Sequence, residues 1–593
     1  MKRRLAIAAL SVAVLVAAGG FVYSHPVRFG LYIAYARNAL LTWSAPKGST
    51  TTELNPAYRG APAPSPVAAA ANPADGEWPS YNRTLTSERY APLAEINTSN
   101  VGRLKVLCTY DTKQYTSFEN GPIVVEGALI GSTSSDIFSL DPATCAENWR
   151  THEETESRFL SPIRGVAYTD GMLFRGSQDG QVLAYDFKTG KRIWKTTVTE
   201  NSEVSIAAAP IAWDGLVFIG NSSGDTKGGK GHMFALDAKT GKVVWEFFLV
   251  PKTEGDRVIA PLGDSPLDTS TWNNPPGFPI SGGGSWASTT LDPATGELYV
   301  PVGNPSPAYA IGVREGDNLY TGSIVVLDAK TGAYKRHFKL VQRDWHDWDV
   351  VSPPSLIKTA GGKKLLAEAP KDGYLYGIDL AKNTVNFRVP VTKIENIDAP
   401  FSVDAEVHFC PGVNGGAAWN GPAYDPQTNL ILVGEIDWCT SVKMQTEQQI
   451  RDVPAGGFWT GMAPSNPFQI LGIQDDGRGA WSGWVYAVDA DSGVWKWRLK
   501  SNYPILSGMT PTAGGLAFFG DVCGDLYALD AATGEKLWGE DIGGAIGGGV
   551  IAYRAGGGEK IAVATGYTNP LWPTELATGQ VVVLGLDGER NPP

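Results

Sequence analysis

Short apolar runs alternate with polar turns along most of the chain, and one pattern recurs. An apolar strand ends at an Asp, a Thr-Gly or Ser-Gly pair follows, and a second strand brings a Trp eight residues after the Asp. The clearest copies are LAYDFKTGKRIW (183–194), MFALDAKTGKVVW (233–245), YAVDADSGVWKW (486–497) and LYALDAATGEKLW (526–538). Because a Gly-containing turn between two such strands is typical of a β-hairpin, the pattern predicts a repeated antiparallel hairpin.

Three weaker copies raise the number of predicted hairpins to seven. They are FSLDPATCAENW (138–149), VVLDAKTGAYKR (325–336) and YGIDLAKNTVNF (376–387). Successive repeat aspartates are mostly 41 to 51 residues apart, which is the size of a four-stranded propeller blade. The two longer intervals, 237 to 328 and 379 to 489, must hold insertions or a degenerate blade.

A single unit of this kind cannot bury both faces of its sheet, so the copies must stack around an axis. We therefore predict an all-β chain folded as an eight-bladed β-propeller of four-stranded antiparallel blades, with an N-terminal strand closing the last blade. Seven blades is the alternative. The repeat tryptophans are expected to dock each blade on its neighbour rather than to bind a ligand.

Composition and charge agree with this fold and narrow the choice of partners. The 593 residues include 70 Gly, 40 Pro and 19 Trp, which suits many short strands joined by tight turns. Lys and Arg number 49 against 61 Asp and Glu, giving a net charge of −12. Nucleic acid is therefore not an expected partner, whereas a metal cation or a basic electron carrier would suit the acidic field.

The N-terminus has the pattern of an export signal. The first residues are basic, and an apolar run from Leu5 to Tyr23 is long enough either for a signal peptide or for an uncleaved membrane anchor. We assign residues 1–45 to this signal or anchor, the Ala-, Pro-, Ser- and Thr-rich range 46–76 to a linker, and 77–593 to the propeller. The propeller is expected in the periplasm.

Five cysteines in an exported chain suggest two disulfides and one remaining thiol. The preferred pairs are Cys108 with Cys145 and Cys410 with Cys439, because each would tie neighbouring strand segments together; Cys523 is then free. No CxxCH motif occurs in the sequence, which excludes covalent c-type haem on this chain.

The repeat, together with several segments in the same order, resembles the pyrroloquinoline quinone (PQQ)-dependent alcohol and sugar dehydrogenases. These segments include SERYAPLAEINTSNVGRLK (87–105), GGGSWASTTLDPATGELYVPVGNPSPAY (282–309) and TAGGLAFFGDVCGDLYALDAATGEKLW (512–538). The resemblance covers roughly residues 75 to 590. It implies an eight-bladed propeller that binds PQQ and a divalent or trivalent cation near its axis.

Four residues match the PQQ contacts that the resemblance implies. Glu119 stands in FENGPIVVEG, and Arg164 stands in IRGVAY. Trp286, after the glycines of SGGGSWAS, occupies the place of the tryptophan that stacks on the quinone. Lys371, before Asp-Gly in EAPKDGYLYGID, occupies the place of the basic residue that reaches the quinone carbonyls, and Lys there is typical of the glucose-type members.

The resemblance also implies a metal site and a catalytic base. Asn304 in VPVGNPSP matches an amide ligand, while Asp225 stands where the alcohol-type members have a longer Glu, a departure that the backbone must offset. In RDWHDWDVVSPP (343–354), Asp347 matches the catalytic base at the metal, and Asp349 is a further candidate ligand. Oxygen ligands of this kind suit Ca²⁺ or a lanthanide.

The remaining residues of that stretch are expected to have structural roles. Asp344 is interpreted as a solvated or turn-capping acid, and His346 as a hydrogen-bonded or exposed histidine. Trp345 and Trp348 are interpreted as pocket wall or strand packing.

Three functions fit these residues. The first is periplasmic, PQQ-dependent oxidation of an alcohol, a secondary alcohol or polyol that could be bulky and cyclic, with a cytochrome c or a membrane quinone as separate electron acceptor. The second is an aldose dehydrogenase of the glucose type. The third is a non-catalytic propeller scaffold of outer-membrane assembly, which would not need the complete set of site residues. Inserts at 246–282 and 440–480 are expected to cap the axial funnel and set substrate size.

Overall fold

The computed structural model describes residues 36, 40, 47–59, 76–155, 162–199, 204–261, 268–463, 473–474, 482–569, 571–572 and 574–587. Strands dominate these ranges, and short helical segments join some of them: η1 (Val101–Arg103), η2 (Ile311–Val313) and α3 (Glu447–Asp452). No helix among these residues is long and apolar enough to cross a membrane. The signal or anchor predicted for residues 1–45 lies outside the described residues, apart from Ala36 and Leu40.

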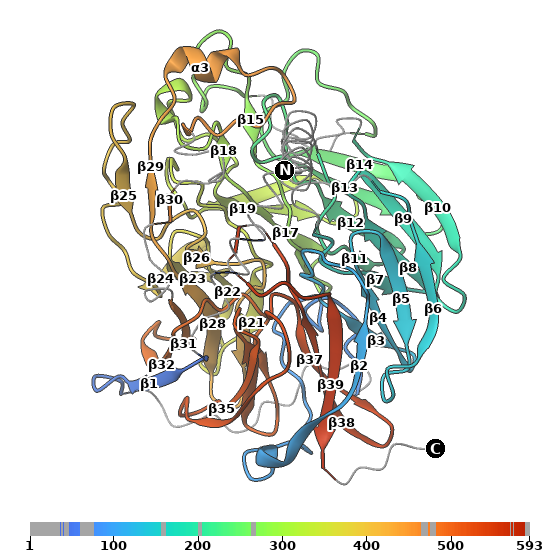
Figure 1. The fold of residues 1–593 in the computed structure, drawn as a ribbon. Helices are drawn as coiled ribbons and strands as arrows, with labels where there is room; N and C mark the ends of the chain where they lie inside the picture. Colours follow the sequence, from blue (N-terminus) through green and yellow to red (C-terminus); the bar gives the residue numbers. More distant parts are fainter. Residues whose placement is uncertain are drawn as a thin grey trace, which may run out of the picture.

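Eight blades of four antiparallel strands follow one another around a ring, which confirms the predicted eight-bladed propeller (Figure 1). The first blade consists of β3 (Ile123–Val125), β4 (Ala128–Ser132), β5 (Asp136–Leu140) and β6 (Glu147–His152), and the second of β7 (Ala167–Thr169), β8 (Met172–Gly176), β9 (Gln181–Asp186) and β10 (Arg192–Thr197). The third consists of β11 (Ile211–Trp213), β12 (Leu216–Gly220), β13 (His232–Asp237) and β14 (Val243–Phe248). The fourth consists of β16 (Thr290–Asp292), β17 (Glu297–Val302), β19 (Ser323–Asp328) and β20 (Tyr334–Lys339).

The next three blades have the same order from the inner to the outer strand. The fifth blade consists of β21 (Ser355–Lys358), β22 (Lys364–Glu368), β23 (Tyr374–Asp379) and β24 (Thr384–Pro390). The sixth consists of β27 (Ala423–Asp425), β28 (Leu430–Asp437), β31 (Ser482–Asp489) and β32 (Trp495–Ser501). The seventh consists of β33 (Thr510–Pro511), β34 (Leu516–Gly520), β35 (Asp525–Asp530) and β36 (Lys536–Asp541).

The two long repeat intervals hold the predicted insertions as short additional strands. These are β15 (Ser281–Gly282), β18 (Pro305–Ser306), β25 (Val407–Phe409), β26 (Gly416–Ala417), β29 (Thr440–Val442) and β30 (Ile473–Gln474).

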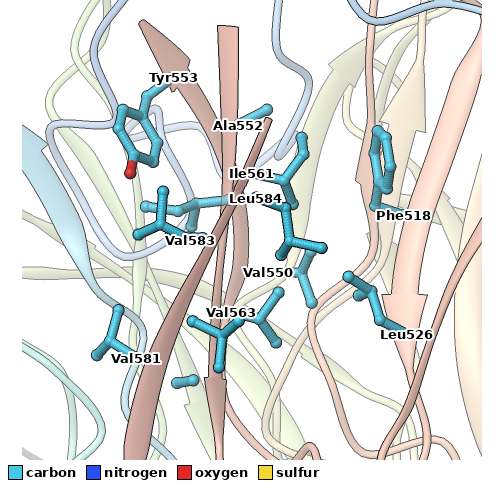
Figure 2. Close-up of a cluster of buried hydrophobic side chains, with 14 of the residues drawn as sticks. Phe518, Leu526, Val550, Ala552, Tyr553, Ile561, Val563, Val581, Val583 and Leu584 are labelled. Carbon is cyan, nitrogen blue, oxygen red and sulfur yellow. The ribbon is translucent and has the colours of Figure 1, made fainter. Parts of the chain in front are cut away.

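The eighth blade joins the two ends of the propeller. It consists of β37 (Val550–Ala555), β38 (Gly558–Thr565) and β39 (Gln580–Leu586), and its outer strand is the N-terminal β2 (Leu104–Asp111), antiparallel to β39 as predicted. Val550, Ile561 and Val583 are fully or almost fully buried, and Phe518 of the seventh blade packs in the same cluster (Figure 2). Pairing and core packing thus both hold the ring closed.

Both predicted disulfides are present. Cys108–Cys145 links β2 of the eighth blade to the β5–β6 turn of the first, so it crosses the junction at which the ring closes. Cys410–Cys439 links the residues that flank β25 and β29. Cys523 is not in a disulfide, as expected.

Four of the repeat tryptophans dock their blade on the next one, in the role that the sequence predicts. Trp194 Nε1 donates a hydrogen bond to the carbonyl of Ala238 (2.9 Å), and its ring lies against Gly241 in the turn of the next blade, where an added Cβ would come within 2.6 Å of the ring. The same arrangement recurs elsewhere in the ring: Trp149 on Gly190, Trp245 on Gly332, and Trp497 on Gly534. A glycine in each of these four turns therefore makes room for the tryptophan of the neighbouring blade.

Residues 76–93 run across one end of the ring and bond to the inner strands of six blades. The carbonyls of Leu85, Thr86 and Glu88 accept N–H bonds from the inner strands of blades four, five and six. Trp78 pairs with the first blade, and Ala91 pairs with the seventh. The eighth blade is bound twice: the carbonyl of Gly76 accepts a backbone N–H bond from it, and the buried side chain of Arg89 donates to the carbonyl of Val550. This segment, here called the axial plug, thus crosses that end of the propeller.

Residues Thr50–Leu54, within the range predicted as a linker, form a strand. This strand, β1, pairs antiparallel with β32 at the outer edge of the sixth blade. The edge of β32 offers unpaired backbone groups, and β1 satisfies them. The described part of the range therefore contacts the propeller.

Gly241→Ala should destabilise the protein more than Gly215→Ala, which changes the same blade. Both glycines have positive φ (71° and 78°), which costs an Ala about 1–2 kcal/mol. At Gly241 the methyl would also overlap the Trp194 ring, adding about 1–3 kcal/mol, whereas nothing lies within 4 Å at Gly215. Urea denaturation of the two variants measures the difference, and equal losses would contradict the docking role of the Trp–Gly contact.

Candidate functional site

A cavity of about 360 Å³ is lined by residues from segments next to strands of several blades. All eight side chains that the sequence analysis selected as cofactor or metal contacts line it, and they come from segments next to strands of the first five blades. They are Glu119 (before β3), Arg164 (before β7), Asp225 (after β12), Trp286 (before β16), Asn304 (after β17), Asp347 and Asp349 (before β21), and Lys371 (between β22 and β23).

Acidic groups gather around one ammonium at one end of the cavity. Lys371 Nζ lies 2.6 Å from Asp349 Oδ2 and 3.4 Å from Asp347 Oδ2. The other oxygen of Asp349, Oδ1, accepts the backbone N–H of Asn304 at 2.8 Å. Burial lowers the pKa of Lys371, but the carboxylates of Asp349 and Asp347 outweigh it and raise that pKa overall. The lysine is therefore a fixed positive charge.

One ammonium does not balance the carboxyl groups that face it. Burial raises the pKa of Asp225 to about 6, and the charge of Asp349 adds to the effect. Burial likewise raises the pKa of Asp347 well above its ordinary value, although Lys371 opposes the shift. Asp225 Oδ1 is buried and has no hydrogen-bond partner among the described residues. The carboxyl oxygens and the Asn304 amide could therefore hold a hard cation such as Ca²⁺ or a lanthanide.

The backbone brings these oxygens close together. A Cβ on Gly303 would lie 2.4 Å from Asp349 Oδ1, so only a glycine leaves room for this carboxylate beside Asn304. Asp347 has a φ of +69°, a conformation that costs a non-glycine residue free energy and recurs at functional sites. The surrounding chain thus holds both acids in the cavity wall.

The other end of the cavity is basic and aromatic. Arg164 forms a buried ion pair with Glu119 (2.6 Å) and donates to the carbonyl of Trp286 at 2.8 Å. Its guanidinium carbon is 4.6 Å from the centre of the Trp286 ring and 5.3 Å from that of Trp419. Burial raises the pKa of Glu119 to about 7 in spite of the arginine. Lys371 Nζ is 5.6 Å from the same Trp286 ring, which thus connects the two ends.

The rest of the stretch 343–354 packs behind the cavity. Asp344 caps the turn by accepting the backbone N–H groups of His346 (2.9 Å) and Trp348 (3.1 Å), and it is buried rather than solvated. His346 is only 2% exposed and stacks on Trp348 with a ring separation of 3.9 Å, which excludes the exposed alternative of the prediction. Burial lowers the pKa of His346 to about 3. Neither Trp345 nor Trp348 is a cavity-lining residue, which favours their packing role.

Sequence reasoning missed several residues of the cavity wall. Trp419 follows GGAA much as Trp286 follows GGGS, and this similarity could have revealed it. Phe458 belongs to the insert predicted to cap the funnel and does line the cavity. Other lining residues gave no recognisable signal, among them Ser205, Asn414, Asn569, Leu571 and Trp572.

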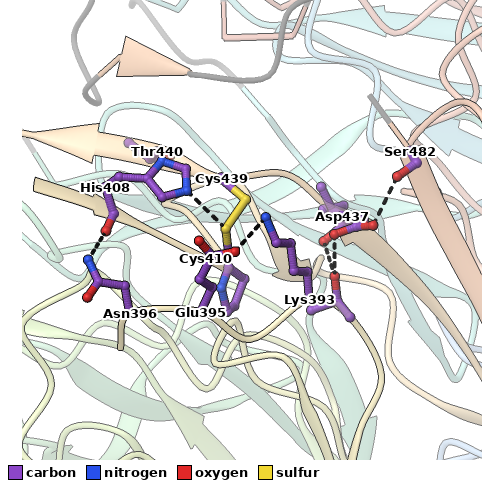
Figure 3. Close-up of a disulfide and its surroundings, with 12 residues drawn as sticks. Lys393, Glu395, Asn396, His408, Cys410, Asp437, Cys439, Thr440 and Ser482 are labelled. Atoms are coloured by element: carbon purple, nitrogen blue, oxygen red, sulfur yellow. Dashed lines mark hydrogen bonds and ion pairs between the residues drawn. A yellow bond between two sulfur atoms is a disulfide. The ribbon is translucent and has the colours of Figure 1, made fainter. Parts of the chain in front are cut away.

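The Cys410–Cys439 disulfide supports one wall of the cavity (Figure 3). The segment 411–415 follows Cys410, and Val413, Asn414 and Gly415 line the cavity. Its backbone is bonded to the residues on either side of Cys439. The N–H of Gly412 donates to the carbonyl of Trp438 (2.7 Å), and the N–H of Val413 donates to the hydroxyl of Thr440 (3.2 Å).

Known proteins provide independent information about this chain. The family model for the PQQ "glucose/ethanol/alcohol dehydrogenase, beta-propeller domain" matches residues 78–384, and a model described as "outer membrane protein assembly factor BamB" matches 482–588. The dehydrogenase subunit of the alcohol dehydrogenase (quinone) of Gluconobacter oxydans is 30% identical over 546 residues, covering 83% of this chain and 70% of the relative.

Solved structures agree with the sequence match. The quinohemoprotein alcohol dehydrogenase ADHIIG of Pseudomonas putida superposes with a TM-score of 0.77 at 25% identity, covering 88% of this chain and 82% of that one. A europium-containing methanol dehydrogenase gives a TM-score of 0.75 at 25% identity, covering 86% and 98%. Together with the family model, these matches show that the chain belongs to the family of PQQ-dependent dehydrogenases.

Proposed function

We propose that this protein is a periplasmic dehydrogenase that uses PQQ and a hard cation to oxidise an alcohol, a secondary alcohol or polyol, to the ketone or aldehyde. The observation that carries the proposal is the convergence of Arg164, Trp286, Lys371 and the Asp347–Asp349 pair on one cavity. These groups come from the second, fourth and fifth blades, and the packing of the ring does not require their joint burial around one cavity.

The acidic end fits a metal ion. Asp225 has an unpartnered buried oxygen, and the carboxyl groups outnumber the single ammonium of Lys371. We assign Asp225, Asn304, Asp347 and Asp349 as candidate ligands, since all offer hard oxygen donors. Ca²⁺ and a lanthanide remain the two alternatives, and the likeness to a europium-containing enzyme supports testing both.

The basic and aromatic end fits PQQ, a planar and negatively charged quinone. Arg164 and Lys371 would hold its anionic and carbonyl oxygens, Trp286 would stack on its rings, and Glu119 would complete the contacts through Arg164. A cavity of about 360 Å³ lies within the usual size of cofactor pockets. When bound, PQQ supplies an electrophilic carbonyl that accepts a hydride, and the cation polarises that carbonyl.

Asp347 is proposed as the base that takes the hydroxyl proton of the alcohol. It lines the cavity with 5% of its surface exposed, so water has little access to compete with the substrate. Lys371 Nζ, 3.4 Å away, stabilises the ionised carboxylate that a base requires. Asp349 holds Lys371 at 2.6 Å and thereby orients it toward Asp347.

The cavity wall supports a bulky substrate. Phe458, Leu571 and Trp572 line it with large apolar surfaces, and Phe458 is 55% exposed. Such a wall suits a substrate with an apolar body, which favours an alcohol over an aldose. The relatives named alcohol dehydrogenases favour the same choice.

A scaffold role is the less supported alternative. A scaffold needs the propeller and its docking tryptophans but not a buried cluster of Arg164, Lys371, Asp225 and Asp347, whose desolvation opposes folding. We therefore retain the enzymatic role. Because the sequence carries no haem motif, electrons are proposed to leave to a separate cytochrome c or membrane quinone.

Reconstitution tests the proposal as a whole. Apoprotein supplied with PQQ and either Ca²⁺ or La³⁺ should reduce an artificial dye in the presence of secondary alcohols or polyols, and omission of PQQ or of the metal should abolish the reaction. A panel of alcohols and sugars, followed by dye absorbance, distinguishes an alcohol from an aldose dehydrogenase. Neither PQQ binding nor turnover with any metal would contradict the proposed function.

Asp347→Asn should lower kcat by about 10²–10⁴-fold, because the amide cannot accept the substrate proton. Binding of PQQ, measured by absorbance titration, should be retained. The matched control is Asp344→Asn, three residues away, because Asp344 caps the turn and does not line the cavity. This control should lower the free energy of unfolding more than it lowers kcat. Full turnover of the Asp347 variant would exclude it as the base.

Asp349→Ala should weaken La³⁺ binding by about tenfold or more, and Ca²⁺ binding by less, because removal of a negative ligand costs more for a trivalent ion. Calorimetric titration of the PQQ-loaded protein measures both affinities. Asp349→Asn keeps an acceptor for the Asn304 N–H but not the charge. If this control matches the native protein while the Ala variant loses affinity, Asp349 is a structural acceptor and not a charged ligand.

A further inference from the structure

A segment outside the blades holds the loop that carries Asp225. The loop comprises residues 224–229, between β12 and β13, and the segment, here called the strap, comprises residues 453–459, directly after α3. In Figure 1, α3 lies at the same end of the molecule as β15, away from the eighth blade. Neither the loop nor the strap is part of a blade sheet.

The strap and the loop pair through their backbones. The N–H of Trp459 donates to the carbonyl of Asp225 (2.7 Å), and the N–H of Lys227 donates to the carbonyl of Gly457 (3.0 Å). The N–H of Gly456 returns a bond to the carbonyl of Lys227 (2.9 Å). The backbone of the loop is therefore paired with the strap and not with a strand of its own blade.

The side chain of Lys227 fastens this pairing to the helix. Its Nζ donates to the carbonyls of Arg451 (2.6 Å) and Val453 (2.8 Å), at the end of α3 where carbonyls have no partner within the helix. The same ammonium lies 5.4 Å from the centre of the Trp459 ring. Trp459 is fully buried, and its Nε1 donates to the carbonyl of Ile450 (2.8 Å).

The opposite side of the loop faces the additional strands β15 and β18 and the metal-site amide. The hydroxyl of Ser306 donates to the carbonyl of Gly224, and the N–H of Gly228 donates to the hydroxyl of Ser281 (2.9 Å). A Cβ on Gly224 would lie 3.3 Å from Asn304 Oδ1. The loop is thus held between the strap and Asn304, and the strap limits how far Asp225 can withdraw.

We propose that Lys227 is a positioning residue of the metal site: by fastening the strap to the loop, it keeps the Asp225 carboxyl beside Asn304, ready for the cation. The inference rests on the proposed role of Asp225 as a ligand. It also connects the metal site to the substrate wall, because Phe458, next to Trp459 in the strap, lines the cavity.

Metal affinity of the PQQ-loaded protein provides the test, with Ca²⁺ and La³⁺ titrated calorimetrically. Lys227→Met should raise the Kd about tenfold or more, as loss of groups that orient metal ligands does elsewhere. Lys227→Arg, which can still donate to the α3 carbonyls, should recover most of the affinity. The matched control is Lys330→Met, since Lys330 also lies over an indole, Trp213, at 5.6 Å, but far from the loop in sequence and exposed.

A double variant separates positioning from general destabilisation. With Asp225→Ala in place, Lys227→Met should cause no further loss of affinity, because the ligand that it positions is absent. An equal loss in both backgrounds would overturn the proposal. If Asp225→Ala weakens binding and Lys227→Met does not, the positioning role is wrong while the ligand assignment stands. If Asp225→Ala has no effect, the ligand assignment and the inference fail together.

Discussion

The contact between a tryptophan of one blade and a turn glycine of the next is the interaction on which the structure depends. Each such indole fits a space that exists only because Gly190, Gly241, Gly332 or Gly534 has no side chain. The contact fixes the angle and separation of neighbouring blades. Since the eight selected site residues come from segments beside five blades, their relative positions depend on these contacts, and a local change at the rim can displace groups at the centre.

Charge is distributed unevenly within that centre. At one end, Lys371 faces Asp225, Asp347 and Asp349, and at the other Arg164 is paired with Glu119. Burying acids without matching bases opposes folding, and a protein retains such an arrangement where a bound group supplies the missing charge. Trp286 lies against cations from both ends, so the two halves of the site share one aromatic surface.

Much of the fold and the site could be predicted because it depends on short-range pattern. The Asp-to-Trp spacing defines a hairpin within thirteen residues or fewer, and repetition of that hairpin defines the ring. The eight site residues could be placed by the motifs around them. His346 could not, since its burial against Trp348 and Phe409 depends on a segment more than sixty residues away. The same holds for Trp572 and for the pairing of Lys227 with the strap, which brings together residues over two hundred positions apart.

The axial plug has a consequence for the order of events during turnover. Residues 76–93 occupy one end of the ring, and none of them lines the cavity. Because the plug occupies that end, access along the axis of the ring is available from the opposite end, for the alcohol and for the oxidised product alike. Along the axis, substrate and product therefore share one side of the ring, and a protein acceptor too large for the cavity can only collect electrons from outside it.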